Sequence, residues 1–278
     1  MPHTERAPAK INLALHVLGR RPDGYHELDS IVAFAGIADQ LTFTEAEDWR
    51  LDVAGPFAQG LSGDEDNLVL KAVRAFEAAF PGLNQKFAIT LQKNLPVASG
   101  IGGGSADAAA TLRALAGLAR VTGWEKLAKH AGKIGADVPV CLFGRACRMR
   151  GLGERFDILD DLPAMPAVLV NPGIPLATAD VFAGLKLAPG HKGFSALDLD
   201  ADWSVHRNDL TMPALILAPA VGKALAALRA AAGVRYARMS GSGATCFGIF
   251  ATEEAAQGAA RHIADIHSDW WVVPTTIG

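Results

Sequence analysis

The chain has 278 residues, with 26 lysines and arginines against 29 aspartates and glutamates, so its formal net charge is −3. Half of its residues are apolar, which is enough for a large core and excludes a disordered chain. The charges are scattered rather than banded, which excludes a surface for long nucleic acid but leaves room for a nucleotide-sized ligand. The length predicts about two domains.

The compartment follows from three further features of the sequence. The least polar long stretch, residues 210–222, contains two prolines and is too short for a membrane span, so we expect no membrane interaction. Glu5, Arg6 and Lys10 stand where a signal peptide needs an apolar run, which predicts a cytoplasmic protein. The cysteines lack C-x-x-C spacing and predict small buried side chains rather than disulfides or a zinc site; they are Cys141, Cys147 and Cys246.

Strands dominate the first part of the chain. Apolar and polar residues alternate over residues 10–17, which predicts a strand with one face on the core. A Pro-Asp-Gly turn follows and leads into Tyr25 and His26. Asn67 is a good N-cap for a helix that ends before Pro81. Further strands are predicted over residues 30–35, 39–44, 50–53 and 87–91.

Helices and strands alternate in the second part of the chain. An alanine-rich helix is predicted over residues 106–120, and residues 187–204 predict a surface loop. The alternation favours an α+β fold with helices on one face of a sheet, and we place the domains at residues 1–154 and 155–278. The other predicted strands cover residues 167–171, 235–239, 246–250 and 271–273, and the other helices cover residues 179–185, 218–232 and 253–267.

A glycine-rich loop stands between the strand that ends near Leu91 and the helix that follows. Glycines let backbone N–H groups approach a phosphate, and the helix N-terminus favours an anion there. The spacing fits neither a Walker loop nor a dinucleotide fingerprint, and the plain alternative is a flexible connection. The residues predicted to hold ATP phosphates are Pro96, Val97, Ala98, Ser99, Gly100, Ile101, Gly102, Gly103, Gly104, Ser105 and Ala106.

Five short motifs together resemble the motif set of the GHMP kinases, the superfamily of galactokinase, homoserine kinase and mevalonate kinase. In chain order they cover residues 8–13, 23–28, 95–110, 135–139 and 240–244. Within that superfamily, Pro-Ala-Lys-Ile-Asn-Leu, Asp-Gly-Tyr-His and Gly-Ala-Asp-Val-Pro resemble the family of 4-diphosphocytidyl-2-C-methyl-D-erythritol kinases. The motifs occur in order from residue 8 to about residue 250, which makes the resemblance specific.

The resemblance implies a fold and an activity. The fold would pair a ribosomal-S5-domain-2-like N-terminal domain with a ferredoxin-like C-terminal domain. The activity would be phosphorylation of the 2-hydroxyl of 4-diphosphocytidyl-2-C-methyl-D-erythritol by ATP and Mg²⁺, in the non-mevalonate isoprenoid pathway, by a monomer or homodimer whose partner is this small-molecule substrate. Another GHMP kinase, for homoserine or a mevalonate-like alcohol, and an inert nucleotide sensor are the alternatives.

The resemblance also implies a catalytic pair, Lys10 and Asp137. A tertiary alcohol is a poor nucleophile, so Asp137 would take its proton as general base. Lys10 would keep Asp137 ionised and stabilise charge on the transferred phosphoryl group. Without the resemblance, Asp137 resembles an N-cap before Val138-Pro139, and Lys10 resembles a solvent-facing strand residue.

Substrate-contacting residues follow from the same resemblance. Asn12, on the same strand face as Lys10, would position the substrate hydroxyl or diphosphate. Tyr25 and His26 would read cytosine, and Phe182, with Thr178 in the same motif, would close its other face; an ordinary core residue is the alternative for Phe182. Ser105 would bind a phosphate or Mg²⁺, or only begin the helix. The turn predicted beside the transferred phosphate is Gly241, Ser242 and Gly243.

Overall fold

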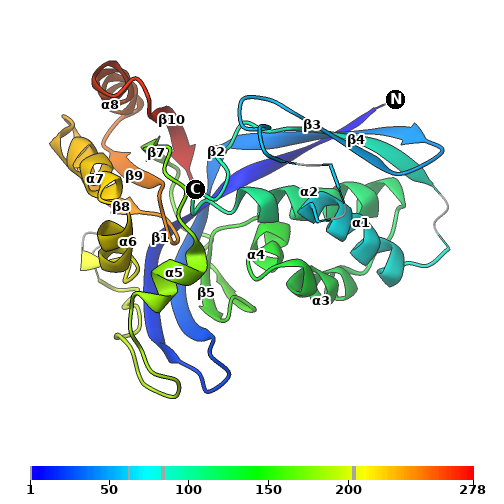
Figure 1. Cartoon of the computed structure of the whole chain (residues 1–278), viewed down its shortest axis with the longest axis horizontal. Helices are drawn as coiled ribbons and strands as arrows, with labels where there is room; N and C mark the ends of the chain where they lie inside the picture. The colour runs from blue at the N-terminus through cyan, green and yellow to red at the C-terminus, as the bar shows by residue number, and fades with distance from the viewer. Residues whose placement is uncertain (1, 62, 65, 83–84, 202–204) are drawn as a thin grey trace. The chain divides into compact units, whose positions relative to one another are not determined.

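The structure is a computed structural model that describes residues 2–61, 63–64, 66–82, 85–201 and 205–278 (Figure 1). The chain forms two compact units, each assembled from separate segments. The first unit takes the residues up to Ala9, Ile37–Val97 and Gly102–Gly144, and the second takes Lys10–Gly36, Ala98–Ile101 and Arg145–Gly278. The predicted division into residues 1–154 and 155–278 concerns folding domains rather than these units, and it stays a prediction.

Strands of the first unit form a small mixed sheet. β4 (Lys86–Gln92) lies between two neighbours: it pairs antiparallel with β2 (His26–Ala46) and parallel with β3 (Arg50–Ala54). β2 also pairs with β1 (His3–Arg20), and both of these long strands contribute to the two units. Alternate side chains of β2 and β4 are buried, because successive residues of a strand point to opposite faces; they are Leu41, Phe43, Ile89 and Leu91.

Helices of the first unit gather on one side of these strands (Figure 1). They are α1 (Leu68–Ala79), α2 (Gly103–Leu118), α3 (Trp124–Ile134) and α4 (Val138–Phe143). The predicted N-cap of α1 is confirmed, since the Asn67 side chain accepts a hydrogen bond of 3.0 Å from the Val69 N–H. The buried residues of α2 are mostly alanines, whose small size lets α1 and α4 pack closely against it.

Strands of the second unit continue an antiparallel sheet in the order β2, β10, β7, β9 and β8. A hairpin, β5 and β6, pairs with the first part of β2. The bounds are β5 (Cys147–Gly151), β6 (Arg155–Ile158), β7 (Met165–Asn171), β8 (Val234–Met239), β9 (Cys246–Phe250) and β10 (Trp271–Ile277).

Helices of the second unit are α5 (Thr178–Ala183), α6 (Thr211–Leu217), α7 (Ala220–Ala230) and α8 (Glu253–Ile266). α7 and α8 pack on the strands of the sheet. Their buried side chains form one core with those of the strands, as expected when an amphipathic helix covers a half-buried sheet.

Most predicted elements agree with the structure, with shifts at their ends. The runs at residues 30–35 and 39–44 form one strand, β2, because Gly36, Ile37 and Ala38 between them are also extended. α3, α6, β5 and β6 were not predicted, and the start of α4 was anticipated only by the alternative in which Asp137 is an N-cap. The end of the predicted loop at residues 187–204 lies outside the described residues. The three cysteines are buried and free, as predicted. Among the described helices, none is long and apolar enough to cross a membrane.

One strand is more deeply buried than its sequence indicates. The strand predicted over residues 10–17 is confirmed as part of β1, but the prediction of a single buried face is wrong, because all eight of its residues are buried. The polar side chains of this segment therefore lie inside the protein, where polar groups need hydrogen-bond partners or a ligand.

Candidate active site

Backbone conformation explains the glycines of residues 98–101 and 240–243. Gly100 has φ +75° and Gly241 has φ +53°, in the left-handed region that favours glycine. A Cβ on Gly100 would lie 2.5 Å from the Ser240 carbonyl oxygen and 2.6 Å from that of Gly243. A Cβ on Gly241 would lie 2.5 Å from the Gly100 carbonyl oxygen. The two glycine clusters, 140 residues apart, therefore lie backbone against backbone.

Hydrogen bonds fix this contact. The Ser240 Oγ donates to the Gly100 carbonyl at 3.1 Å and accepts from the Asn12 N–H at 3.0 Å. The Thr245 N–H donates to the Ser99 carbonyl at 3.0 Å. Ala98 also has a positive φ, +50°, in a residue type that rarely adopts it. The segment is thus held in one unusual conformation rather than acting as a flexible connection.

We expect Gly100→Ala to lower the free energy of unfolding by about 2–4 kcal/mol, because the new methyl group meets two backbone carbonyls and the φ is unfavourable. Gly117→Ala is the matched control, since nothing lies within 4 Å of a Cβ at this α2 position. The free energy of unfolding of this control should rise by about 0.5–1 kcal/mol, because alanine has a higher helix propensity than glycine. Urea unfolding measures both, and equal stability of the two variants would contradict the close packing.

The N-terminus of α2 has the features that favour an anion. Gly102 is its N-cap with φ +64°, and the Ala106 N–H donates to the Gly102 carbonyl at 2.8 Å. The N–H groups of the first turn have no intrahelical acceptor, and this turn contains no acidic side chain. A Cβ built on Gly135 would lie 4.0 Å from the Ser105 Oγ. Ser105 therefore stands beside the loop that leads to Asp137.

A buried charge cluster, which the sequence did not predict, holds the chain at residues 93–95 and the helix α2 at Asp107. Lys93, directly after β4, donates its Nζ to Asp39 and to Asp107, at 2.8 Å for Asp107 Oδ2. Asp39 Oδ1 accepts from the Asn94 N–H at 2.6 Å and from the Leu95 N–H at 2.8 Å. We call Asp39, Lys93 and Asp107 the buried triad. It ties the chain just before Pro96 to the second turn of α2.

Two carboxylates of the triad share one ammonium group. Burial raises the pKa of Asp107 to about 7, and the charge of Asp39 adds to this, against the opposite effect of Lys93. Burial alone would lower the pKa of Lys93, but the two carboxylates outweigh it and hold that pKa above its usual value. The Asp107 Oδ1 is buried with no hydrogen-bond partner among the described residues.

Lys10 belongs to the second unit and Asp137 to the first. Lys10 is 4% exposed and its N–H donates to the Ile101 carbonyl at 2.9 Å, so a solvent-facing lysine is wrong. Asp137 does hold the N-cap position of α4, with Pro139 in the first turn. Its side chain makes no capping hydrogen bond. The carboxylate of Asp137 is therefore not used to cap the helix.

Asn12 presents an unpaired oxygen. Ser30 Oγ donates to the Ala14 carbonyl at 2.6 Å, so it accepts from Asn12, whose Nδ2 lies 2.8 Å away. This orients the amide and leaves Asn12 Oδ1 buried without a partner among the described residues. A buried acceptor of this kind suits a hydroxyl donor better than a diphosphate oxygen.

Of the residues predicted to read cytosine, Tyr25 and His26 follow the turn at residues 22–24, and Phe182 lies on α5. The ring centroids of His26 and Phe182 are 4.8 Å apart, so these two side chains are in contact. Tyr25 is 64% exposed, and its N–H donates to Asp23 Oδ1 at 3.1 Å. Burial, and next the positive charge of Arg20, lower the pKa of His26. His26 is therefore neutral at pH 7, with one ring nitrogen able to donate and the other to accept.

Two side chains hold the turn at residues 239–243. Thr178 Oγ1 lies 2.9 Å from Ser242 Oγ, which joins the start of α5 to the turn. Asn208 Nδ2 donates to the Met239 carbonyl at 2.8 Å and to the Gly241 carbonyl at 2.7 Å. Sequence reasoning assigned no role to Asn208. A polar Asn-Asp pair directly before an apolar helix was the available signal.

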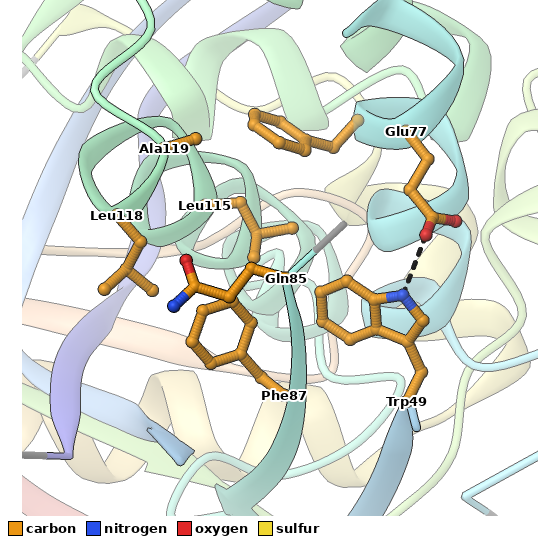
Figure 2. Close-up of a pocket in the computed structure, with 8 residues that line it drawn as sticks. Trp49, Glu77, Gln85, Phe87, Leu115, Leu118 and Ala119 are labelled. Carbon is orange, nitrogen blue, oxygen red and sulfur yellow. Dashed lines mark hydrogen bonds between the residues drawn. The ribbon is translucent and has the colours of Figure 1, made fainter. Parts of the chain in front are cut away.

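A small cavity in the first unit offers no competing nucleotide site. This cavity of about 20 Å³ lies between α1, α2 and β4, lined by Trp49, Phe87 and Leu115 (Figure 2). The Trp49 indole N–H donates to Glu77 there at 2.8 Å. The cavity has room for about one water molecule and none for a nucleotide. No group of three or more histidine, cysteine or acidic side chains in the described ranges is arranged to hold a metal ion.

Comparisons with known proteins identify relatives of this chain. The GHMP kinases N terminal domain matches residues 67–145, and the GHMP kinases C terminal domain matches residues 197–267. The 4-diphosphocytidyl-2-C-methyl-D-erythritol kinase of Parvibaculum lavamentivorans is 51% identical over 287 aligned residues, which cover 100% of this chain and 99% of the relative. The enzyme of the same name from Methylorubrum extorquens is also 51% identical, over 99% of this chain and 98% of its own.

Solved structures show the same similarity. A crystal structure of 4-(cytidine 5'-diphospho)-2C-methyl-D-erythritol kinase superposes with a TM-score of 0.81 at 33% identity, over 99% of both chains. Homoserine kinase from Cytophaga hutchinsonii, at 18% identity and a TM-score of 0.64 over 98% of this chain and 94% of its own, shares the fold. The predicted GHMP kinase fold is thus confirmed. The chain is a kinase and belongs to the 4-diphosphocytidyl-2-C-methyl-D-erythritol kinase family of the GHMP kinases.

Proposed function

We propose that this kinase transfers the γ-phosphoryl group of ATP to the 2-hydroxyl of 4-diphosphocytidyl-2-C-methyl-D-erythritol in the cytoplasm. The observation that carries the proposal is the 51% identity, over the whole chain, to enzymes named for this substrate. The glycine-rich segment before α2, with its left-handed glycines and its helix N-terminus, supports a phosphate site at residues 96–106.

Asp137 is the proposed general base and Lys10 its electrostatic partner. The substrate oxygen attacks the γ-phosphorus, its proton passes to the Asp137 carboxylate, and the bond to the departing ADP oxygen breaks. Two observations support the pair: the Asp137 side chain does not cap α4, and Lys10 is a buried cation. A buried ammonium group is desolvated, which strengthens its interaction with developing negative charge.

Mg²⁺ is the proposed metal, and the residues present fit it. Mg²⁺ prefers oxygen ligands, commonly one or two from the protein with the rest from phosphates and water. The hydroxyl of Ser105, beside the loop that carries Asp137, supplies one such oxygen at the start of α2. When bound, the ion would neutralise phosphate charge.

Asn12 is proposed to accept a hydrogen bond from a substrate hydroxyl through Oδ1. We expect Asn12→Ala to lower kcat/KM for the alcohol substrate by about 10–100-fold, because one oriented hydrogen bond is lost. The KM for ATP should stay within about twofold. Initial-rate kinetics with each substrate varied measures both constants. A KM for ATP that rises as much as the KM for the alcohol would contradict this role.

Tyr25, His26 and Phe182 are the proposed cytosine site, with Thr178 beside the turn at Ser242. Because the pKa of His26 is lowered from 6.5, the neutral imidazole persists as the pH falls to that value. We expect the KM for the cytidine substrate to be constant from about pH 9 to pH 7 and to rise only below about pH 6.5, as His26 gains a proton.

His26→Asn should remove this acidic rise in KM, whereas His262→Asn, at an exposed residue of α8, should keep it. A rise that persists unchanged in His26→Asn would assign the titration to another group.

A substrate panel tests the proposed function. ADP formation is measured with ATP, Mg²⁺ and one acceptor at a time: 4-diphosphocytidyl-2-C-methyl-D-erythritol, homoserine or mevalonate. We expect ADP with the first acceptor and at least about 100-fold less with the others, since the Asp-Gly-Tyr-His motif belongs to the cytidine-bearing substrate's family. Turnover of homoserine or mevalonate alone would establish another GHMP specificity, and ATP binding without turnover would establish a sensor.

A further inference from the structure

A second, broad pocket lies in the second unit, and none of its lining residues is among those assigned above to the phosphate loop, the catalytic pair or the cytosine site. It has a volume of about 800 Å³, and its lining residues come mainly from β8, the outermost strand of the sheet, and from α6 and α7. Figure 1 shows these three elements in the second unit. This volume is within the range typical of small-molecule sites.

Arginines from three segments converge on this pocket. Arg207 precedes α6, Arg229 is in the last turn of α7, and Arg235 and Arg238 are on β8. We call the pocket that these four residues help to line the arginine pocket. Among the described lining residues, Asp209 is the sole carboxylate.

That carboxylate is already engaged. Asp209 Oδ2 accepts from the Val17 N–H at 2.9 Å, and Oδ1 accepts from Arg207 Nε at 2.6 Å. The Asp209 carboxylate thus offsets the positive charge of Arg207, and the Val17 N–H holds it in place. Arg229 and Arg235 therefore add positive charge that no other carboxylate in the described lining offsets.

The remaining arginines differ in how they are held. Arg238 is 8% exposed, donates to the Leu13 carbonyl at 3.1 Å, and lies 4.5 Å over the ring of Tyr236. A guanidinium group so nearly buried is costly to desolvate and is pre-organised by its stacking. Arg229 and Arg235 are exposed, and no hydrogen bond or ion pair joins either to the described part of the chain. Two guanidinium groups therefore remain available beside a fixed third.

A purely structural explanation exists for charged residues here. Arginines on an edge strand prevent other strands from pairing with it. Edge protection needs exposed side chains and does not need a pocket. It does not account for Arg238, which is nearly buried, or for Arg229, which comes from helix α7.

We propose that the arginine pocket binds a small phosphate-bearing anion, at a site separate from the proposed nucleotide site. Guanidinium groups match phosphate oxygens in geometry and charge, and several of them favour a diphosphate over a single phosphate. The exposed apolar side chains of Phe194 and Met212 line the same pocket and suit an apolar portion of such a ligand. A concave pocket of this size fits a small molecule better than an acidic protein segment, which would need a longer groove.

The test is a titration of the full chain with inorganic pyrophosphate, followed by ¹H–¹⁵N NMR in EDTA at low salt. We expect saturable shifts of the backbone N–H signals at residues 207–209, 229 and 235–239. Arg229→Ala/Arg235→Ala should weaken this binding at least about tenfold, because two charge-assisted contacts are lost. Arg261→Ala, at an exposed position of α8 outside the pocket, should leave it unchanged.

Three results would overturn the proposal. Shifts confined to residues 98–106 would place the anion at the proposed ATP loop alone, and shifts absent from both regions would leave edge protection as the role of the arginines. Tighter binding of an oligo-glutamate peptide than of pyrophosphate, with the same shifts, would assign the pocket to an acidic chain. None of these outcomes depends on catalytic turnover, so the proposed function can fail or hold independently.

Discussion

Asp137→Asn should lower kcat by about 10²–10⁴-fold, the usual contribution of a general base. The amide keeps the shape of the side chain but cannot accept the proton of the attacking hydroxyl. Because the Asp137 side chain does not cap α4, the variant loses none of the free energy of unfolding that a helix cap contributes. The KM for ATP should stay within about twofold, since binding of the nucleotide does not require the base.

Steady-state kinetics together with thermal unfolding separates the catalytic effect from a folding defect. Asp265→Asn is the matched control, because it makes the same change at an exposed position of α8. The control should retain full activity. A kcat for Asp137→Asn within about threefold of the parent would remove Asp137 from its proposed role, and a large loss of stability would show that its side chain supports the fold.

Lys93→Met should lower the free energy of unfolding by about 3–5 kcal/mol, because it leaves the carboxylates of Asp39 and Asp107 buried without their cation. Urea unfolding at pH 8 measures the effect. Lys129→Met, at an exposed position of α3, is the control and should stay within about 0.5 kcal/mol of the parent. A cost below about 1 kcal/mol for Lys93→Met would contradict the buried triad.

Asp107→Asn should make the free energy of unfolding less dependent on pH. The variant leaves the Lys93 cation paired with one carboxylate, that of Asp39. The folded-state pKa of Asp107, about 7, lies above its ordinary value of 3.8, so the native state binds this proton more tightly than the unfolded chain. The stability that it contributes is complete below pH 3.8 and is lost as the pH rises through about 7. Between pH 5 and pH 8, the free energy of unfolding should therefore fall less for Asp107→Asn than for the parent. Urea unfolding of both proteins at the two pH values measures this difference.

The sequence predicted the elements that depend on local patterns. Asn67 before a helix and the strands β1 and β4 are visible in the order of the residues, and all three are confirmed. The glycine clusters were also visible, since only a special backbone requires so many glycines. Their contact at Gly100 and Ser240 was not predictable, because it joins positions 140 residues apart.

The side chains that support the site were harder to predict for a physical reason. Lys93, Asp39 and Asp107 each stand in an ordinary sequence context, and their function arises only when three elements bury them together. Asn12 was predicted on its strand face, but the direction of its amide depends on Ser30, which lies on the neighbouring strand. Asn208 likewise acts on carbonyls about 30 residues away.

The most direct test of the central claim is the position of phosphate in the product. The reaction with ATP, Mg²⁺ and 4-diphosphocytidyl-2-C-methyl-D-erythritol is followed by ³¹P and ¹³C NMR. We predict one new phosphate monoester signal, coupled to the quaternary carbon that bears the methyl group, in equal amount to the ADP formed. A phosphate coupled to any other carbon, or ADP formed without a new ester, would contradict the proposed function.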